Sequence, residues 1–438
     1  MLDVATGLAN IRDLFERLEP GAGAVIERYL SGMETDYRLA IERFLYTNFT
    51  HLRGLATVPI LRRLGRLGVK LTRSIETDVA AQFEHVQLRQ LLTYAAVFLS
   101  SAPKITPAFY GIMNYTTLVE GVSYPMGGFG TFVDSLHRLA VAAGARIHTG
   151  ATVDHIHTET TGGKTPRATG VTYRDATGEH YLAADVVISC ADRQHTEAQL
   201  VDDKRAARPK YWRRRNPGMS CVLAYLGVKG QLPQLAHHSL FFSADWDPDF
   251  DAVFPHDASA SQSRSAFSKS LYVSRPSATD PSVAPAGHEN VFILVPVPAM
   301  DDGIVGSLNH TPDPETTAIV DQAIDLVGAR IGVPDLAERV VTRHTVGPGD
   351  FQDRFNAWQG NALGLAHTLS QSAFFRGSNA SKHIGNVFFA GATTVPGVGL
   401  PMCLISAENI VKRLRHDTTT GPLPEPLQPT AARVTHNR

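Results

Sequence analysis

Cysteine is scarce in this chain: its 438 residues include only three, Cys190, Cys221 and Cys403. Their spacing matches neither a metal site nor a disulfide framework, so we expect free, buried thiols in a reducing compartment. A metal site is not expected. Nor does any Ser/His/Asp order or carboxylate pair identify a catalytic residue, and the catalytic groups stay unassigned.

An excess of one charge sign is also absent. The chain has 41 basic and 42 acidic residues, a formal net charge of -1. No global field therefore attracts nucleic acid, which we do not expect as a partner. No apolar run approaches the roughly 18 residues that span a bilayer, and no signal peptide opens the sequence. These absences predict a cytoplasmic protein, soluble or peripheral to a membrane.

The pyrophosphate loop of dinucleotide-binding folds is missing. Such folds normally begin with a strand, Gly-x-Gly-x-x-Gly and a helix. The glycines at 127, 128 and 130 are followed by Val133 where the last glycine should fall, and Met402 takes that position after Gly397 and Gly399.

The most informative segment is 386–401. An apolar run at 387–390 predicts a buried strand of a parallel sheet. A glycine-rich turn follows, and Pro401 then opens a helix. The apolar positions of this helix recur at helical spacing: Leu404, Ala407, Val411 and Leu414. Glycines let a backbone approach a cofactor, and a helix start offers free N–H groups, so the pattern favours nucleotide or flavin binding over a simple packing turn.

The remaining pattern predicts the order of elements. Residues 1–118 read as helical, and a helix with Phe132, Leu136 and Leu139 on one face ends at Gly144. Strands are expected at 145–148, 152–157 and 185–189, with a hairpin at 171–182 that turns at 175–178. Residues 201–345 mix strands and loops around a helix near 317–331, and the tail from Asp417 is expected to be disordered.

Two segments of the sequence are rich in basic residues. Residues 52–71 interleave large apolar residues with five cations and no acid, which suits a membrane interface. The alternative is a core-facing helix with a solvated basic edge, and Pro59 argues against one continuous helix. The second segment, 204–215, is predicted to be a solvated loop.

Three polar features have plain structural explanations. His237 and His238 are adjacent, so their rings point to different faces of a strand and do not suggest a metal site. Glu120 and Asp192 flank glycine-rich sequence. Either suits a cofactor hydroxyl, but capping is the commoner role.

Several separated blocks, in order, carry a family resemblance. They lie at 118–128, 235–239, 280–285, 295–298, 360–365, 369–376 and 391–401. Through them the chain resembles bacterial phytoene desaturases of the carotenoid pathway, within the flavin amine oxidase and desaturase superfamily.

The resemblance implies bound FAD, a phytoene or related apolar polyene substrate that enters from a membrane surface, and hydride transfer to the flavin. Gly391 and Ala392 would approach the flavin. Val153 would contact the adenine through its backbone, and Ala191 would lie near the pyrophosphate. The helix start near the flavin ring would supply Val398, Gly399, Leu400 and Met402.

The implied fold class is α/β: a Rossmann-like FAD-binding fold, incomplete at the N-terminus, with a mixed α+β substrate domain and a helical membrane-associating region. The expected boundaries are 1–118 for the helical region, 119–200 and 380–416 for the two FAD-binding parts, 201–379 for the substrate domain and 417–438 for the tail. The family's glycine-rich loop would precede this sequence by roughly one hundred residues. A misassigned start, a separate N-terminal flavin-binding piece or a decayed gene would each explain this difference.

The expected function is FAD-dependent desaturation of phytoene by a peripheral membrane enzyme. Two alternatives stay open: a desaturase or isomerase of a C30 or later carotenoid, and a non-catalytic partner of a separate flavin subunit. A homo-oligomer also stays open. A flavin amine oxidase is disfavoured because no aromatic pair is placed to cage an amine.

Overall fold

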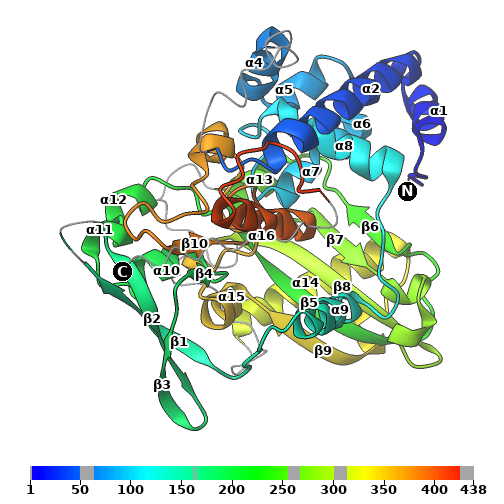
Figure 1. Ribbon diagram of the computed structural model, residues 1–438. Helices are drawn as coiled ribbons and strands as arrows, with labels where there is room; N and C mark the ends of the chain where they lie inside the picture. The colour runs from blue at the N-terminus through cyan, green and yellow to red at the C-terminus, as the bar shows by residue number, and fades with distance from the viewer. Residues whose placement is uncertain are drawn as a thin grey trace.

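A computed structural model describes residues 2–49, 64–160, 162, 165–254, 267–299 and 313–424. Figure 1 shows a helical N-terminal region in blue and cyan, a long antiparallel sheet below it, and a smaller unit from which a narrow hairpin projects. The last long helix, in red, lies between these parts.

The N-terminal region is helical, as predicted. Its packed interior places Phe15 edge-to-face against Phe83 with ring centroids 5.4 Å apart, beside the long helix α2. The elements are α1 (Leu8–Leu18), α2 (Ala22–Ala40), the π-helical η1 (Ile41–Leu45), α4 (Leu64–Thr72), α5 (Ile75–Ala80), α6 (Val86–Thr93), α7 (Ala95–Phe98), η3 (Ala108–Gly111), α8 (Ile112–Tyr115) and the π-helical η4 (Thr116–Glu120).

The basic and apolar segment 52–71 falls mainly outside the described residues. Its end belongs to α4, where Lys70 forms an ion pair of 2.6 Å with Asp36. Among the described residues, none of the helices combines the length and the apolar character needed to cross a bilayer.

A helix and a three-stranded antiparallel sheet follow. The predicted helix is α9 (Phe129–Ala142), and Gly144 after it has a φ of 90°. The predicted strand at 152–157 is β1 (Thr152–Glu159), and the predicted hairpin is formed by β2 (Arg167–Asp175) and β3 (Gly178–Ala183).

The predicted strand at 145–148 is wrong. These residues form no strand in the structure, and Ile147 is exposed. A strand needs a neighbour that accepts its backbone hydrogen bonds, and the described part of the chain supplies none there.

Two strands far apart in sequence form a parallel sheet. β4 (Val187–Ser189) pairs with β10 (Val387–Phe389), with Val187 opposite Val387. Both strands were predicted. A helix follows each of them: α10 (Arg193–Gln199) after β4 and α16 (Leu400–Leu414) after β10.

The solvated loop predicted at 204–215 is wrong. This segment forms the short helices α11 (Lys204–Ala207) and α12 (Pro209–Trp212). Trp212 is buried and donates from Nε1 to the Glu197 carboxylate at 3.1 Å, a contact that no local pattern reveals.

The large sheet has the strand order β6-β7-β8-β5-β9 and is antiparallel throughout. Its strands are β5 (Met219–Lys229), β6 (His238–Phe241), β7 (Leu271–Ser274), β8 (His288–Pro298) and β9 (Val340–Val346). Around it lie α13 (Asp247–Val253), α14 (Pro314–Ile331), α15 (Pro348–Phe355) and the short 3₁₀ turns η5 (Pro276–Ala278), η6 (Pro281–Val283), η7 (Ala337–Arg339), η8 (Trp358–Gly360), η9 (Leu369–Gln371) and η10 (Ala373–Phe375).

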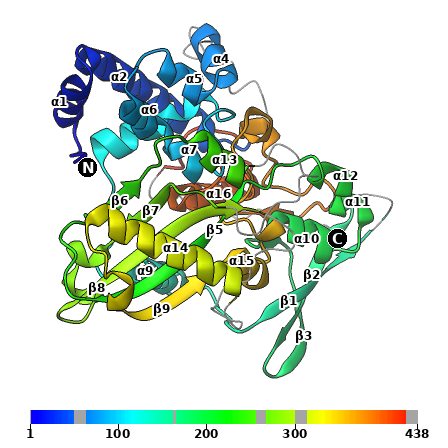
Figure 2. The same ribbon diagram turned by 180° about the vertical axis from the view of Figure 1, so that it is seen from behind.

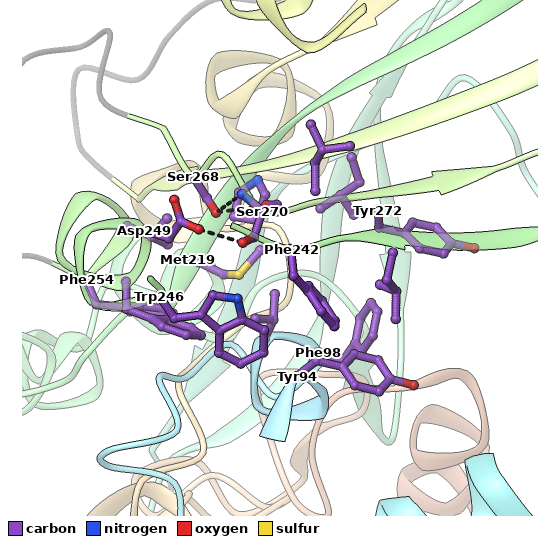
Figure 3. Close-up of a pocket in the computed structure, with 17 residues that line it drawn as sticks. Tyr94, Phe98, Met219, Phe242, Trp246, Asp249, Phe254, Ser268, Ser270 and Tyr272 are labelled. Carbon is purple, nitrogen blue, oxygen red and sulfur yellow. Dashed lines mark hydrogen bonds between the residues drawn. The ribbon is translucent and has the colours of Figure 1, made fainter. Parts of the chain in front are cut away.

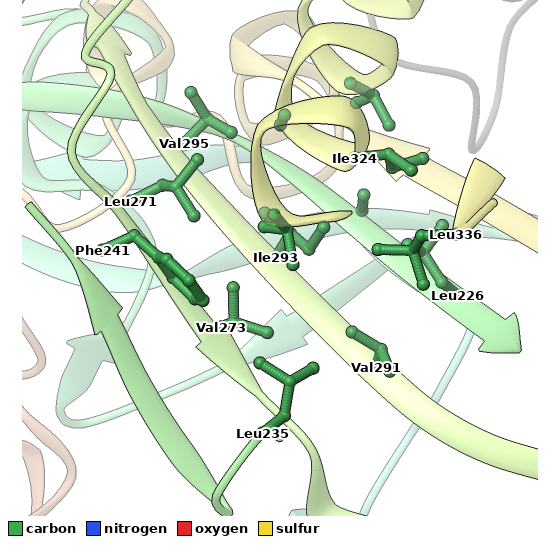
Figure 4. Close-up of a cluster of buried hydrophobic side chains, with 14 of the residues drawn as sticks. Leu226, Leu235, Phe241, Leu271, Val273, Val291, Ile293, Val295, Ile324 and Leu336 are labelled. Carbon is green, nitrogen blue, oxygen red and sulfur yellow. The ribbon is translucent and has the colours of Figure 1, made fainter. Parts of the chain in front are cut away.

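The main core lies between this sheet and α14, which confirms the helix predicted near 317–331. Figure 2 shows α14 packed across the sheet. Alternate residues of β8, among them Val291, Ile293 and Val295, point to this helix (Figure 4), as period-two alternation requires. The opposite face carries Tyr272 and Phe292, whose rings are 6.2 Å apart. The sheet therefore separates an aliphatic core from an aromatic surface.

Part of the C-terminal tail is ordered against α16. The Lys412 ammonium donates to the carbonyls of Thr419 at 2.7 Å and Gly421 at 2.6 Å. The expected disorder is therefore wrong for residues 417–424, and the rest of the tail lies outside the described residues.

Replacing Ile293, which is fully buried between β5 and α14, tests this core. We expect Ile293→Ala to lower the free energy of unfolding by about 2–5 kcal/mol through lost apolar burial and a residual cavity. Val341→Ala, at an exposed position of β9, should change it by less than about 0.5 kcal/mol. Urea denaturation measures both, and equal effects would contradict the core assignment.

Candidate functional site

The ends of β4 and β10 bring two predicted cofactor segments together. Parallel strands present their carboxyl ends at one edge, where ligands of α/β sheets bind. The Ala390 amide donates to the Ser189 carbonyl at 3.0 Å, and a Cβ built on Gly391 would lie 3.8 Å from the Cys190 carbonyl oxygen. Ala191 and Gly391 therefore follow adjacent strand ends, although they are 200 residues apart in sequence.

The segment from Gly391 to Met402, called here the glycine loop, folds back on the first turn of α16. The Gly391 amide, with a φ of 102°, donates to Ser406 Oγ at 2.8 Å, and that hydroxyl donates to the Cys403 carbonyl. Gly399, with a φ of 121°, is exposed at the N-cap of α16. The backbone at both glycines is therefore free of side-chain obstruction.

The helix start collects the other predicted contacts. Val398 and Gly399 precede Leu400, the first residue of α16, and the Met402 side chain lies against Gly399. Val153 lies elsewhere, on β1 of the separate antiparallel sheet, opposite Tyr173. The structure thus brings together all the predicted cofactor residues except Val153.

A buried arginine fixes the position of the glycine loop through hydrogen bonds. The Arg376 side chain is fully buried and donates to carbonyl oxygens of Ala392 at 2.8 Å, Thr394 at 3.1 Å, Leu365 at 3.1 Å and Gln371 at 3.4 Å. Burial lowers the pKa of Arg376 to about 10, so the guanidinium stays charged at neutral pH. No role for Arg376 was predicted from the sequence, because the segment around it has no periodic pattern.

A buried ion pair within α10 lies against β10. Arg193 bonds Glu197 through two nitrogens at 2.8 and 2.7 Å, and its guanidinium lies 4.8 Å from the Phe389 ring centroid. Its backbone amide donates to Thr393 Oγ1 at 3.2 Å. Asp192 caps α10 by accepting from the Gln194 and His195 amides, which confirms the capping role, and burial raises the pKa of Asp192.

These residues fit the flavin part of a flavin nucleotide. The glycine loop contains no acidic residue, and its backbone is accessible at Gly391 and Gly399. The buried Thr394 hydroxyl has no partner in the described part of the chain. The sequence offers no Gly-x-Gly-x-x-Gly turn for a pyrophosphate.

A second candidate site is an aromatic pocket beneath the large sheet (Figure 3). About 570 Å³ of space between its walls is free of protein atoms, a volume that includes open solvent. It lies between the helical region and the aromatic face of the sheet. Its walls include Tyr94, Phe98, Met219, Leu240, Phe242, Trp246, Phe250, Phe254 and Tyr272.

This pocket was not predicted from the sequence, although the sequence contains a pattern that indicates it. Aromatic residues recur every fourth position at 242, 246, 250 and 254. This spacing places them on one side of a helix, and three of them line the pocket around α13 together with Phe242 before it.

Apolar side chains are exposed on the elements that carry the glycine loop. Leu404 on α16 is 48% exposed and Ile188 on β4 is 45% exposed. The apolar stripe of α16 thus faces outward, while Asn409 and Lys412 are buried. No residue of α9 is buried. Strands of parallel sheets are normally covered on both faces, so this half of the site is open on one side.

Comparison with known proteins places the chain in a family. No family model matches it. It is 35% identical over 418 residues to a carotenoid 3,4-desaturase of Haloarcula japonica, covering 95% of this chain and 79% of the relative. It is 32% identical over 400 residues to a zeta-carotene-forming phytoene desaturase of Myxococcus xanthus, covering 91% and 72%. A lycopene-forming phytoene desaturase of Pantoea ananas is 30% identical over 376 residues, covering 85% and 72%.

Among solved structures, a putrescine oxidase aligns with 91% of this chain and 76% of its own, with 12% identity and a TM-score of 0.49. The sequence relatives are desaturases, which makes this chain of mixed α/β structure an oxidoreductase. The sequence relatives narrow this class: the chain belongs to the carotenoid desaturase family, whose cofactor is FAD. The resemblance drawn from the sequence blocks is confirmed.

Arg376 offers a test of how the glycine loop is held. Arg376→Met would leave buried carbonyls of Ala392 and Thr394 without donors, so we expect a loss of roughly 3 kcal/mol in unfolding free energy. Arg376→Lys should recover only part of it, because one ammonium cannot reproduce the planar fork. The exposed Arg12→Met should change stability by less than about 0.5 kcal/mol in the same urea titration. Equal values for the two Met variants would overturn this role.

Proposed function

We propose that this protein desaturates phytoene. Sequence identity of 32% and 30% to two phytoene desaturases, over most of this chain, is the observation that carries the proposal. Each new double bond removes one hydride and one proton from neighbouring carbons. FAD, when bound, supplies the hydride acceptor.

The chain's own residues bind and orient the flavin. Gly391 and Ala392 and the helix start at Val398, Gly399, Leu400 and Met402 offer backbone contacts without side-chain obstruction. Val153 and Ala191 remain candidates for the adenine and pyrophosphate ends. The charge of Arg376, held under the loop, favours negative charge that develops on the reduced flavin.

The polyene chain would occupy the aromatic pocket. Its walls come from Tyr94 and Phe98 on one side and from the sheet on the other, and aromatic faces suit a conjugated hydrocarbon. Such a substrate dissolves in lipid, so we propose a cytoplasmic enzyme that contacts a membrane surface. The basic and apolar segment 52–71 supports that contact through its composition.

We also propose that a nucleotide-binding unit covers the exposed apolar faces of β4 and α16. The unit would add strands beside the two-stranded parallel sheet and supply the pyrophosphate loop. The matched relatives support this, because the chain spans 79% and 72% of their length and the remainder is sufficient for such a unit. It could act as part of a longer chain or as a separate piece, and a homo-oligomer is the competing way to cover these faces.

Leu404 tests the proposed covering. The unmatched segment of the Haloarcula japonica relative, added to this protein with FAD, should co-elute with it and carry flavin absorbance. Leu404→Asp should weaken this association at least about tenfold, because a carboxylate would be buried without a partner. Val86→Asp, at an exposed position of α6, is the matched control and should have no effect. Association that survives Leu404→Asp would exclude this face, and self-association lost in the same variant would favour the homo-oligomer.

Production of coloured polyenes tests the function itself. Expression with the nucleotide-binding unit in a host that makes phytoene should give zeta-carotene or more unsaturated products by chromatography. Removing the unit should abolish the colour, because FAD is no longer held.

A second substrate is favoured by one comparison. The relative that is 35% identical is a carotenoid 3,4-desaturase, so a later carotenoid is the alternative to phytoene. A colourless host with phytoene, together with conversion of an already unsaturated carotenoid, would select that alternative. No conversion of either, in the presence of bound FAD, would favour a non-catalytic partner.

A further inference from the structure

A short apolar surface is exposed next to the segment that holds the glycine loop. Leu369 in η9 and Phe374 and Phe375 in η10 are all exposed, Phe375 to 59%, and the two turns contact each other. In Figures 1 and 2 the orange part of the chain that contains these turns lies between α4 and α12. Exposed apolar side chains that gather in one place mark an interaction site, whereas scattered ones need no explanation. We call these three residues the apolar tip.

The phenylalanines of the apolar tip are held in their outward position. Before them, the Ser372 hydroxyl accepts a hydrogen bond from the Tyr110 hydroxyl at 2.8 Å. After them, Arg376 is fully buried by its hydrogen bonds to the glycine loop. Phe374 also packs against Phe49, with ring centroids 4.5 Å apart. The two rings therefore cannot turn inward unless these contacts break, and their exposure is a fixed feature of the surface.

Basic side chains lie beside the apolar tip. Arg215 donates to the Ser370 carbonyl at 2.8 Å, which joins the end of α12 to η9. Lys210, Arg213 and Arg214 are exposed, and none of these three forms an ion pair within the part of the chain that the structure describes. We call these three cations the basic patch.

No acidic residue interrupts the segments that carry these features. The chain has no Asp or Glu at 204–244, which contains the basic patch, or at 354–407, which contains the apolar tip. The whole chain, by contrast, is nearly neutral, with 41 basic and 42 acidic residues. Positive charge is thus concentrated beside an apolar protrusion. This combination fits a membrane interface, where apolar side chains enter the acyl boundary and cations meet anionic headgroups.

We propose that the apolar tip and the basic patch dock the protein on an anionic lipid surface, with Phe374 and Phe375 in the acyl boundary. This inference rests on the proposed function, in which the substrate dissolves in lipid, and it names the face that meets the membrane. Phe375 directly precedes Arg376, which binds the Ala392 and Thr394 carbonyls. Docking would therefore place the glycine loop close to the membrane surface.

Vesicle flotation of the full chain tests this surface. The probes are vesicles of phosphatidylcholine alone and vesicles with roughly one third phosphatidylglycerol, which the unsubstituted chain should prefer. Phe375→Ser should weaken partitioning into both kinds about tenfold, because an apolar ring no longer enters the acyl boundary. Arg213→Glu combined with Arg214→Glu should weaken binding to the anionic vesicles at least about tenfold and change binding to the neutral ones less than about twofold.

Matched controls come from other faces of the molecule. Phe355→Ser, at a phenylalanine of α15 that is 61% exposed, should leave partitioning unchanged. Arg28→Glu combined with Lys229→Glu changes the net charge equally at two exposed positions and should weaken anionic binding less than about threefold. Phe375→Trp keeps an aromatic ring at the tip, and brominated lipids should quench its added fluorescence. The fluorescence added by Phe355→Trp should not be quenched.

Equal partitioning of Phe375→Ser and Phe355→Ser, with the added fluorescence of Phe375→Trp unquenched, would overturn the docking surface. Binding that is lost only on Arg62→Glu with Arg63→Glu would assign the contact to segment 52–71 and would overturn this inference, while the proposed membrane enzyme stands. Failure of the unsubstituted chain to float with either kind of vesicle would overturn this inference and the proposed membrane contact together. The conversion of phytoene would still be decided separately by chromatography.

Discussion

A single buried charge fixes the geometry of the glycine loop, the proposed flavin site. The Arg376 guanidinium joins the segment 365–371 to the glycine loop through four carbonyl oxygens. Burying an unpaired charge is unfavourable, and these hydrogen bonds offset that cost only while both segments keep their positions. His367 packs beside the arginine. Burial, together with the charge of Arg376, lowers the pKa of His367 well below its usual value, so the neutral ring bonds the Leu99 carbonyl. A side chain at Gly397 would collide with this ring, so the glycine there is a packing requirement.

The same network connects the flavin site with the aromatic pocket. The Met219 amide, at the start of β5 and at the pocket wall, donates to Ser100 Oγ at 2.9 Å, and the Ala362 amide donates to the Met219 carbonyl at 3.1 Å. Leu365 follows Ala362 by three residues, and its carbonyl accepts a hydrogen bond from Arg376. A continuous set of short contacts therefore runs from the pocket wall to the glycine loop. A substrate chain in the aromatic pocket and a flavin at the glycine loop would each lie against one end of the segment 360–376.

The parts of this fold that depend on local pattern were predictable. The helix that became α14, the hairpin of β2 and β3 and the strand β10 all follow from periodicity and turn residues. The predictions are wrong where contacts between residues far apart in the sequence determine the local structure. The strand expected at 145–148 has no partner to pair with, and 204–215 is ordered by the Trp212–Glu197 contact. The role of Arg376 depends on carbonyls of two separate segments, which no spacing in the sequence encodes. The aromatic residues at every fourth position around α13, by contrast, are encoded by their spacing in the sequence.

The exposed stripe of α16 shows what a hydrophobic pattern encodes. Leu404, Val411 and Leu414 recur at helical spacing as a core-facing surface should, yet the helix buries Ile405, Asn409 and Ile410 instead. Asn409 and Lys412 are buried because they bind carbonyls of Leu45 and Tyr46, which anchors this side of the helix to the N-terminal region. The helix therefore has a buried face that is hydrogen-bonded to the N-terminal region and an apolar face that the described residues leave uncovered. Because the glycine loop leads directly into this helix, a partner that covers the apolar face would also enclose a flavin bound at the loop, and cofactor affinity and assembly would then become one equilibrium.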